Sequence, residues 1–98
     1  MPEMTFDVRW PDGSVQSCYS PSLVMHDYLT TGGRYTVAEF LTRSGQALQQ
    51  ASERVRAKYG FVCTSAAATA DRIRRTANRF PGDAEVEITA MQPEPERT

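Results

Sequence analysis

Three side chains close together in the sequence have the chemistry of thiol catalysis: Cys18, His26 and Asp27. A cysteine becomes a nucleophile when a neighbouring base takes its proton, and a carboxylate can orient that base. No local signature of a cysteine-dependent enzyme family surrounds Cys18, and closeness in sequence does not by itself bring side chains together. We keep these residues as catalytic candidates, but favour a structural thiol and a histidine at the surface or at a helix end.

The cysteines and the histidine do not form a recognisable metal or redox motif. The chain has 2 cysteines, Cys18 and Cys63, and 1 histidine, which lack the paired spacing of a zinc site. No C-x-x-C pair is present, so no disulfide framework or redox motif is indicated. Free cysteines are among the most buried residue types, and a Cys18–Cys63 bridge requires a fold that brings the two together. We expect reduced thiols, no metal and no cofactor.

A second candidate site, for an anion, consists of Gly32, Gly33 and Arg34, just before a predicted helix. Free N–H groups at the start of a helix can bind anions, and the arginine adds positive charge. The phosphate-binding loop of nucleotide-dependent enzymes also needs a lysine at a fixed spacing, which this segment lacks. Because glycine pairs commonly mark turns, we favour a plain turn and keep anion binding as the alternative.

Basic residues are concentrated in one part of the chain, although 11 basic and 12 acidic residues leave a net charge of −1. Most of them lie between residues 51 and 79, where the only acidic residues are Glu53 and Asp71. A solvated helical face is the simplest explanation. The alternative is a docking surface, because arginine is enriched at protein interfaces and suits carboxylates and phosphates. The candidates for such a surface are Arg54, Arg56, Arg72, Arg74, Arg75 and Arg79.

The balanced charge argues against some other classes of partner. It gives no general attraction to DNA or to membranes, and no basic groove with aromatic side chains stands out. A nucleic-acid-binding regulator is therefore the least favoured function, whereas contact between acidic strands and basic helices of two copies would give a homo-oligomer. No apolar run approaches the ~20 residues of a membrane span, and the first residues lack a secretory-signal pattern. We expect a cytoplasmic protein.

The hydrophobic pattern predicts the order β-β-α-α-α-β. Alternating apolar and polar residues predict strands at 4–10 and 14–19, joined by a Pro-Asp-Gly turn. Apolar residues at steps of three and four predict helices at 23–29, 36–60 and 64–80. Thr36 and Glu39 form a capping box for the long helix, and Ser22 can cap the short one. A last strand is predicted at 84–91, with its core-facing residues Val86, Ile88 and Ala90.

These elements predict a single α+β domain over residues 1–91 and a flexible tail over 92–98. Strands with one apolar face and helices with one apolar stripe favour a small three-stranded sheet with the helices packed on one face. We expect the first strand in the middle. Gly45 inside the long helix costs ~1 kcal/mol relative to alanine, and is either a point of close approach or simply tolerated.

Two stretches of the sequence resemble a known family. Residues 9–13 (Arg-Trp-Pro-Asp-Gly), followed by residues 18–22 (Cys-Tyr-Ser-Pro-Ser), are similar to the opening of a small bacterial family named for a nitrogen-starvation response in mycobacteria. Residues 51–61, with Cys63 shortly after, are similar to that family's second signature. The resemblance extends over about residues 2–90.

The resemblance implies a setting rather than an activity. Proteins of this family are typically encoded beside a nitrilase, a radical-SAM protein, an acetyltransferase and a flavoprotein, which implies nitrogen scavenging from nitriles or cyanide-derived compounds. It assigns no catalytic or cofactor-binding residue. Together with the basic segment, it leads us to expect a non-catalytic accessory protein that binds a protein of such a cluster. The main alternative is a small thiol-dependent enzyme or ligand-handling protein that uses Cys18, His26 or Cys63.

Overall fold

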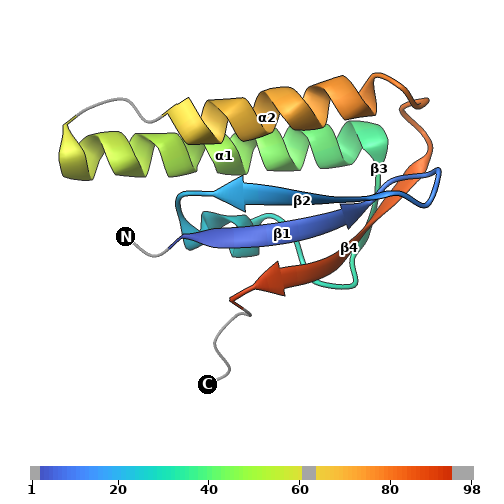
Figure 1. Cartoon of the computed structure of the whole chain (residues 1–98), viewed down its shortest axis with the longest axis horizontal. Coiled ribbons are helices and arrows are strands. Elements are labelled where there is room, and N and C mark those ends of the chain that lie inside the picture. Colours follow the sequence, from blue (N-terminus) through green and yellow to red (C-terminus); the bar gives the residue numbers. More distant parts are fainter. Residues whose placement is uncertain (1–2, 61–63, 94–98) are drawn as a thin grey trace.

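The computed structural model, which describes residues 3–60 and 64–93, contains a four-stranded antiparallel sheet with helices across one face (Figure 1). The sheet order is β2-β1-β4-β3, so β1 is an inner strand as expected. The predicted α+β class is confirmed. The strands are β1 (Met4–Arg9), β2 (Val15–Ser20), β3 (Arg34–Thr36) and β4 (Glu85–Gln92). The helices are the 3-10 helix η1 (Leu23–Asp27) and the α-helices α1 (Val37–Tyr59) and α2 (Thr64–Ala77), which run antiparallel to each other (Figure 1).

β1 and β2 form the predicted hairpin. Gly13 has a φ of 88°, in the left-handed region that glycine tolerates, and its N–H donates to the Trp10 carbonyl at 2.8 Å. The Asp12 carboxylate accepts hydrogen bonds from the Ser14 hydroxyl at 2.6 Å and from the Ser14 N–H at 2.9 Å. Both hydrogen bonds lower the pKa of Asp12, and the bond from the Ser14 hydroxyl has the larger effect. The turn residues therefore set the register of the hairpin.

Two parts of the predicted topology are wrong. Residues 34–36, expected to lie in a turn and at a helix start, form the fourth strand, β3, in which Tyr35 pairs with Val86 of β4. Three residues are too few to show an alternation. The segment predicted as a helix at 23–29 is instead the 3-10 helix η1, capped by Ser22, whose hydroxyl accepts from Val24 N–H at 3.3 Å. So short a segment cannot sustain an α-helix, because nucleation is costly.

β4 contains a bulge that changes which residue enters the core. Phe6 of β1 pairs with Met91 and Val8 pairs with Ile88, so β4 has one extra residue in this interval. A bulge moves the following residues to the opposite faces of the strand. Met91 is therefore buried at 1% exposure. The prediction that Ala90 faces the core is wrong, since it pairs with Asp7 and only Val86 and Ile88 face inward as predicted.

α1 begins and ends at its predicted signals. The Thr36 hydroxyl accepts a hydrogen bond from Glu39 N–H at 3.1 Å, and the Glu39 carboxylate lies 3.8 Å from Arg43 Nε. Gly60 ends the helix with a φ of 76°, as left-handed glycine caps commonly do. A Cβ added at Gly45 would meet nothing within 4 Å. No close approach therefore requires glycine at this position.

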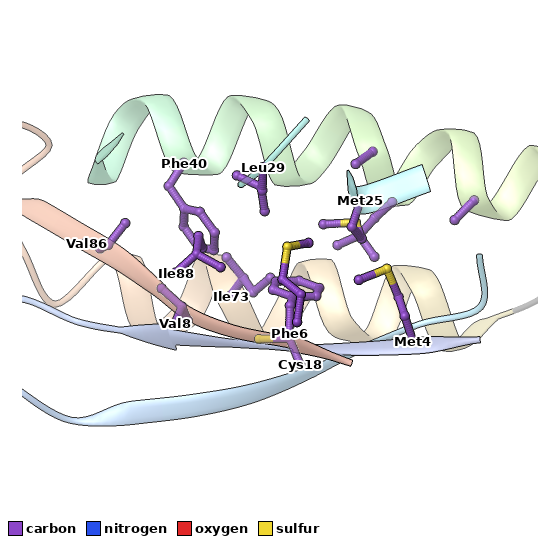
Figure 2. Packing of buried hydrophobic residues seen from close by; sticks show 14 of the residues in the cluster. Met4, Phe6, Val8, Cys18, Met25, Leu29, Phe40, Ile73, Val86 and Ile88 are labelled. Atoms are coloured by element: carbon purple, nitrogen blue, oxygen red, sulfur yellow. The ribbon is translucent and has the colours of Figure 1, made fainter. Parts of the chain in front are cut away.

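The core lies between the helices and the covered face of the sheet (Figure 2). Trp10 closes one end of this core and is 2% exposed. Its ring stacks on Phe80, with centroids 5.8 Å apart, and meets Phe40 edge-on at 5.7 Å. The Trp10 Nε1–H donates to Gln16 Oε1 at 3.0 Å, so the one polar atom of the indole is satisfied.

Candidate functional site

Cys18 lies in the core rather than in a cleft. Its side chain is 2% exposed, and the residue pairs with Phe6 across the β1–β2 ladder (Figure 2). Burial raises the pKa of the Cys18 thiol to about 12, while the nearby Arg72 lowers it by a smaller amount. The free thiol therefore stays protonated at neutral pH. This environment suits the structural role that we favoured for Cys18; Cys63 lies outside the described residues.

His26 lies in η1, where it contacts the chain beyond the end of β4. Its Nε2 is 3.0 Å from the Pro93 carbonyl oxygen. Because a carbonyl only accepts, Nε2 carries the proton and Nδ1 is the acceptor. Nδ1 is buried without a hydrogen-bond partner in the described part of the chain, and Asp27 is exposed. No hydrogen bond joins Cys18 to His26 or His26 to Asp27 among the described residues, so the structure does not assemble the three catalytic candidates.

The glycine turn before β3 has its backbone donors occupied. Gly32 N–H donates to the Ile88 carbonyl at 2.6 Å, and Gly33 N–H donates to the Thr30 carbonyl at 2.9 Å. An anion could bind these N–H groups only by displacing those hydrogen bonds. Of the anion-binding candidates, only the exposed side chain of Arg34 remains available.

Arg34 lies on the open face of the sheet among groups of both charges. It pairs across the β3–β4 ladder with Glu87, whose Oε1 lies 3.3 Å from Arg9 Nη1. A depression of about 230 Å³ beside Trp10 is lined by both arginines, by Glu87 and by Glu85. Two arginines and two glutamates cancel in charge. This depression therefore has no preference for an anion.

The six arginines proposed as a docking surface form two separate groups. α1 and α2 are antiparallel, so the last turns of α1 lie at one end of the helix layer and the second half of α2 lies toward the other (Figure 1). Arg54 and Arg56 belong to the first group; the second group comprises Arg72, Arg74, Arg75 and Arg79. All six side chains are exposed. We therefore treat the two groups as separate candidate surfaces.

Arg72, Arg75 and Arg79 form a row along α2 and the turn that follows it, which we call the arginine row. Arg72 and Arg75, three positions apart, lie on one side of α2, and Arg79 follows in the turn after the helix. The side of α2 that faces α1 carries Ala66, Ala67 and Ala70 instead. Arg72 lowers the pKa of Cys18 in β2, and Arg79 lowers the pKa of Asp12 in the hairpin turn. α2 packs against β2, and the row lies on the side of α2 away from α1, so the row runs along the β2 edge of the sheet.

The positive charge of α2 is only partly neutralised. Asp71 Oδ1 lies 2.5 Å from Arg74 Nη2, and Asp71 Oδ2 lies 2.9 Å from Arg75 Nε. Arg72 and Arg79 have no acidic partner within ion-pair distance among residues 3–60 and 64–93. One carboxylate thus serves two arginines and leaves two others available. Our sequence reasoning pooled the six arginines and missed this row, although the i, i+3, i+7 spacing was readable.

A groove of about 260 Å³ lies along the contact between α1 and α2. Its walls are mainly small side chains, from Gly45 and Ser52 of α1 and from the alanines of α2 that face α1. Leu48 and Gln49 complete the lining. The groove reflects the small size of the packed side chains.

The described ranges hold neither a candidate metal cluster nor a helix able to span a membrane. No group of three or more histidine, cysteine, aspartate or glutamate residues there could hold a metal ion. None of the helices in the same ranges combines the length and the apolar character that crossing a membrane requires.

Comparison with known proteins gives one family. The model of the family described as "Nitrogen starvation-induced protein NitG" matches residues 5–91. The matched range includes the two stretches on which the resemblance was based, and it runs from β1 to β4. The curated proteins and the solved structures contain no match to the chain.

Proposed function

Because the chain belongs to the family of the nitrogen starvation-induced protein NitG, we propose that it is an accessory protein of nitrogen scavenging that binds a protein partner through α2. The observation that carries this proposal is the surplus of exposed positive charge on α2. One aspartate there is shared by Arg74 and Arg75, while Arg72 and Arg79 keep unpaired guanidinium groups among the described residues. The partner that the family setting favours is an enzyme of a nitrilase-type pathway for nitriles or cyanide-derived compounds.

Arginine is well suited to this role. Its guanidinium group is planar and weakly hydrated, and it binds carboxylates through two parallel hydrogen bonds. The chain as a whole carries a net charge of −1. The rest of the chain is therefore acidic, in contrast to the positive face of α2. Such an asymmetry orients an approaching partner before contact, because complementary potentials steer association. A partner surface rich in carboxylates fits α2 best.

The proposal is tested by capturing the tagged protein with its partner from the nitrogen-starved host and by quantitative mass spectrometry. The informative variant is Arg72→Glu/Arg79→Glu, because neither residue takes part in an ion pair that the reversal would break. The matched control is Arg54→Glu/Arg56→Glu at the other end of the helix layer. We expect the unaltered protein and the control to recover one partner in stoichiometric amount, and the α2 variant to lose it.

Two results would overturn the proposal. Equal recovery of the partner by the α2 variant would show that α2 is not the docking surface. Recovery of the tagged protein alone would argue for a small-molecule role instead. Circular dichroism of both variants should match that of the unaltered protein, because exposed arginines contribute little to folding stability.

A further inference from the structure

β2 is an edge strand that lacks the features by which proteins usually close an edge. Native edge strands are protected by charged residues, proline, bulges or short length, since unpaired backbone groups otherwise recruit another strand. β2 has 6 residues, Val15–Ser20, and none of them is charged or is proline. Its pairing with β1 is continuous, from Met4 opposite Ser20 to Arg9 opposite Val15. Within residues 3–60 and 64–93, no other strand pairs with this edge, and its pairing with β1 is regular.

Val15 and Ser17 are among the residues of β2 whose backbone groups point away from the sheet. The Trp10 N–H donates to the Ser14 carbonyl at 2.8 Å, which makes Trp10 and Ser14 a hydrogen-bonded pair. In an antiparallel ladder, hydrogen-bonded and non-hydrogen-bonded pairs alternate. Gln16 and Cys18 therefore bond to β1, whereas the N–H and C=O groups of Val15 and Ser17 point outward. Both residues are exposed, and Val15 is 56% exposed.

The arginine row runs above the same edge. A strand added beside β2 would have its alternate side chains on the helix side of the sheet. Those side chains would face Arg72 and Arg79, neither of which has an acidic partner within the described ranges. Carboxylates at alternate positions of the added strand would fit this row. The charge of α2 thus selects an acidic segment for an edge that is neutral in itself.

A second copy of the chain fits this edge poorly. Antiparallel pairing of β2 with β2 of another copy would be a two-fold contact, in which the same surface is used twice. Both α2 helices would then lie on the same side of the joined sheet, with the two arginine rows facing each other. Like charges in such proximity are destabilising. The arginine row therefore disfavours self-association through β2.

We propose that the β2 edge accepts an extended, acidic segment of a partner protein as an additional strand. Main-chain hydrogen bonds to Val15 and Ser17 hold the segment, and its carboxylates bind the arginine row. Strand addition of this kind takes its affinity from the main chain and its specificity from alternate side chains. The inference rests on the proposed function, because it assigns the partner of α2 a conformation and a register.

The first test measures amide hydrogen exchange on the unaltered protein, with a synthetic peptide that alternates glutamate with valine as the probe. At a peptide concentration of about ten times Kd, exchange of the Val15 and Ser17 amides should slow about tenfold, because only the small unbound fraction exchanges. A control peptide with lysine in place of glutamate should not bind. Absence of binding by the glutamate peptide, or binding without protection of these two amides, would overturn the inference.

The second test uses the variant Ser17→Pro, which removes an outward N–H and leaves the bonds to β1 in place. Its matched control, Ser17→Ala, keeps the N–H. We expect Ser17→Pro to weaken peptide binding by more than about tenfold, the equivalent of about 1.4 kcal/mol or one hydrogen bond, and Ser17→Ala to leave it unchanged. If Ser17→Pro fails to fold, the exchange experiment still decides the question.

The two proposals can fail separately. If Arg72→Glu/Arg79→Glu loses peptide binding but Ser17→Pro does not, strand addition is overturned and the α2 docking surface is retained. Loss in Ser17→Pro alone would support strand addition and overturn the arginine row as the source of specificity. Unchanged binding in both variants would overturn both proposals.

Discussion

The two halves of α2 are attached to the rest of the molecule in different ways. The second half is held by Ile73 and Ala77 in the core and, just beyond the helix, by Phe80 stacked on Trp10. The first half contacts α1 mainly through small side chains and leaves a groove opposite Gly45. Aromatic side chains bury far more apolar area than alanine does. The arginine row begins on the firmly held half, where a binding surface is pre-organised.

The largest effect on the second half of α2 is expected when Trp10, on which Phe80 stacks, is replaced. Trp10→Ala should destabilise the protein by about 3–5 kcal/mol, because a large cavity would remain beside Phe40 and Phe80. Trp10→Phe is the matched control, since it keeps an aromatic ring; it loses part of the indole volume and the hydrogen bond to Gln16, and should cost less than Trp10→Ala. Unfolding in urea gives both values. A loss below about 1 kcal/mol for Trp10→Ala would contradict the role of Trp10 as the anchor of α2.

The alkylation rate of Cys18 reports how often α2 and the sheet separate and expose the core. A rise of the thiol pKa from 9.0 to about 12 makes the thiolate about a thousandfold scarcer near neutral pH. In the variant Cys63→Ala, alkylation of Cys18 should therefore be slower by about this factor than alkylation of a free thiol. A rate near that of a free thiol would show that the core opens easily at β2.

The same shift predicts a pH dependence of stability. The folded state holds the Cys18 proton more tightly than the unfolded state, so this contribution is complete below pH 9.0 and is lost as the pH rises toward about 12. Replacing the thiol in Cys18→Ala should flatten the decline over this range. Unfolding free energies measured for both proteins from pH 8 upward check the sign, and equal slopes would contradict it.

Amide hydrogen exchange compares the two halves of α2 directly. Residues held by large apolar side chains open rarely, whereas those held by few contacts open more often. The amide of Ala77 should exchange at least about tenfold more slowly than that of Ala70, because it lies in the half anchored at Trp10. Trp10→Phe should preserve this order. Equal rates along the helix would show that α2 opens as one unit.

The smallest expected effect is at Gly45, in the wall of the groove. Gly45→Ala should stabilise the protein by about 1 kcal/mol, because alanine is the better helix former and nothing lies within 4 Å of the added Cβ. The reverse change at an exposed position of the same helix, Ala57→Gly, should cost a similar amount. Thermal unfolding measures both. A destabilising Gly45→Ala would mean that the two helices come closer than the groove suggests.

Much of the fold could be predicted because its causes are local. The hairpin turn depends on Asp12, Gly13 and Ser14, whose hydrogen bonds span only a few residues. The start and end of α1 depend on Thr36 and Gly60 for the same reason. The alternation in β1 places its apolar residues in the core without reference to any distant partner. For these elements the sequence alone was sufficient.

The remaining features depend on pairings between distant segments. β3 is a strand only because β4 lies beside it, and the bulge in β4 exists only relative to β1. The helices run antiparallel, which separates Arg56 from Arg79, and His26 contacts the Pro93 carbonyl rather than Cys18. Composition and spacing identified which residues carry thiol, imidazole and guanidinium groups. Which of these groups share a surface was decided by the tertiary structure, because only packing between distant elements brings such groups together or keeps them apart.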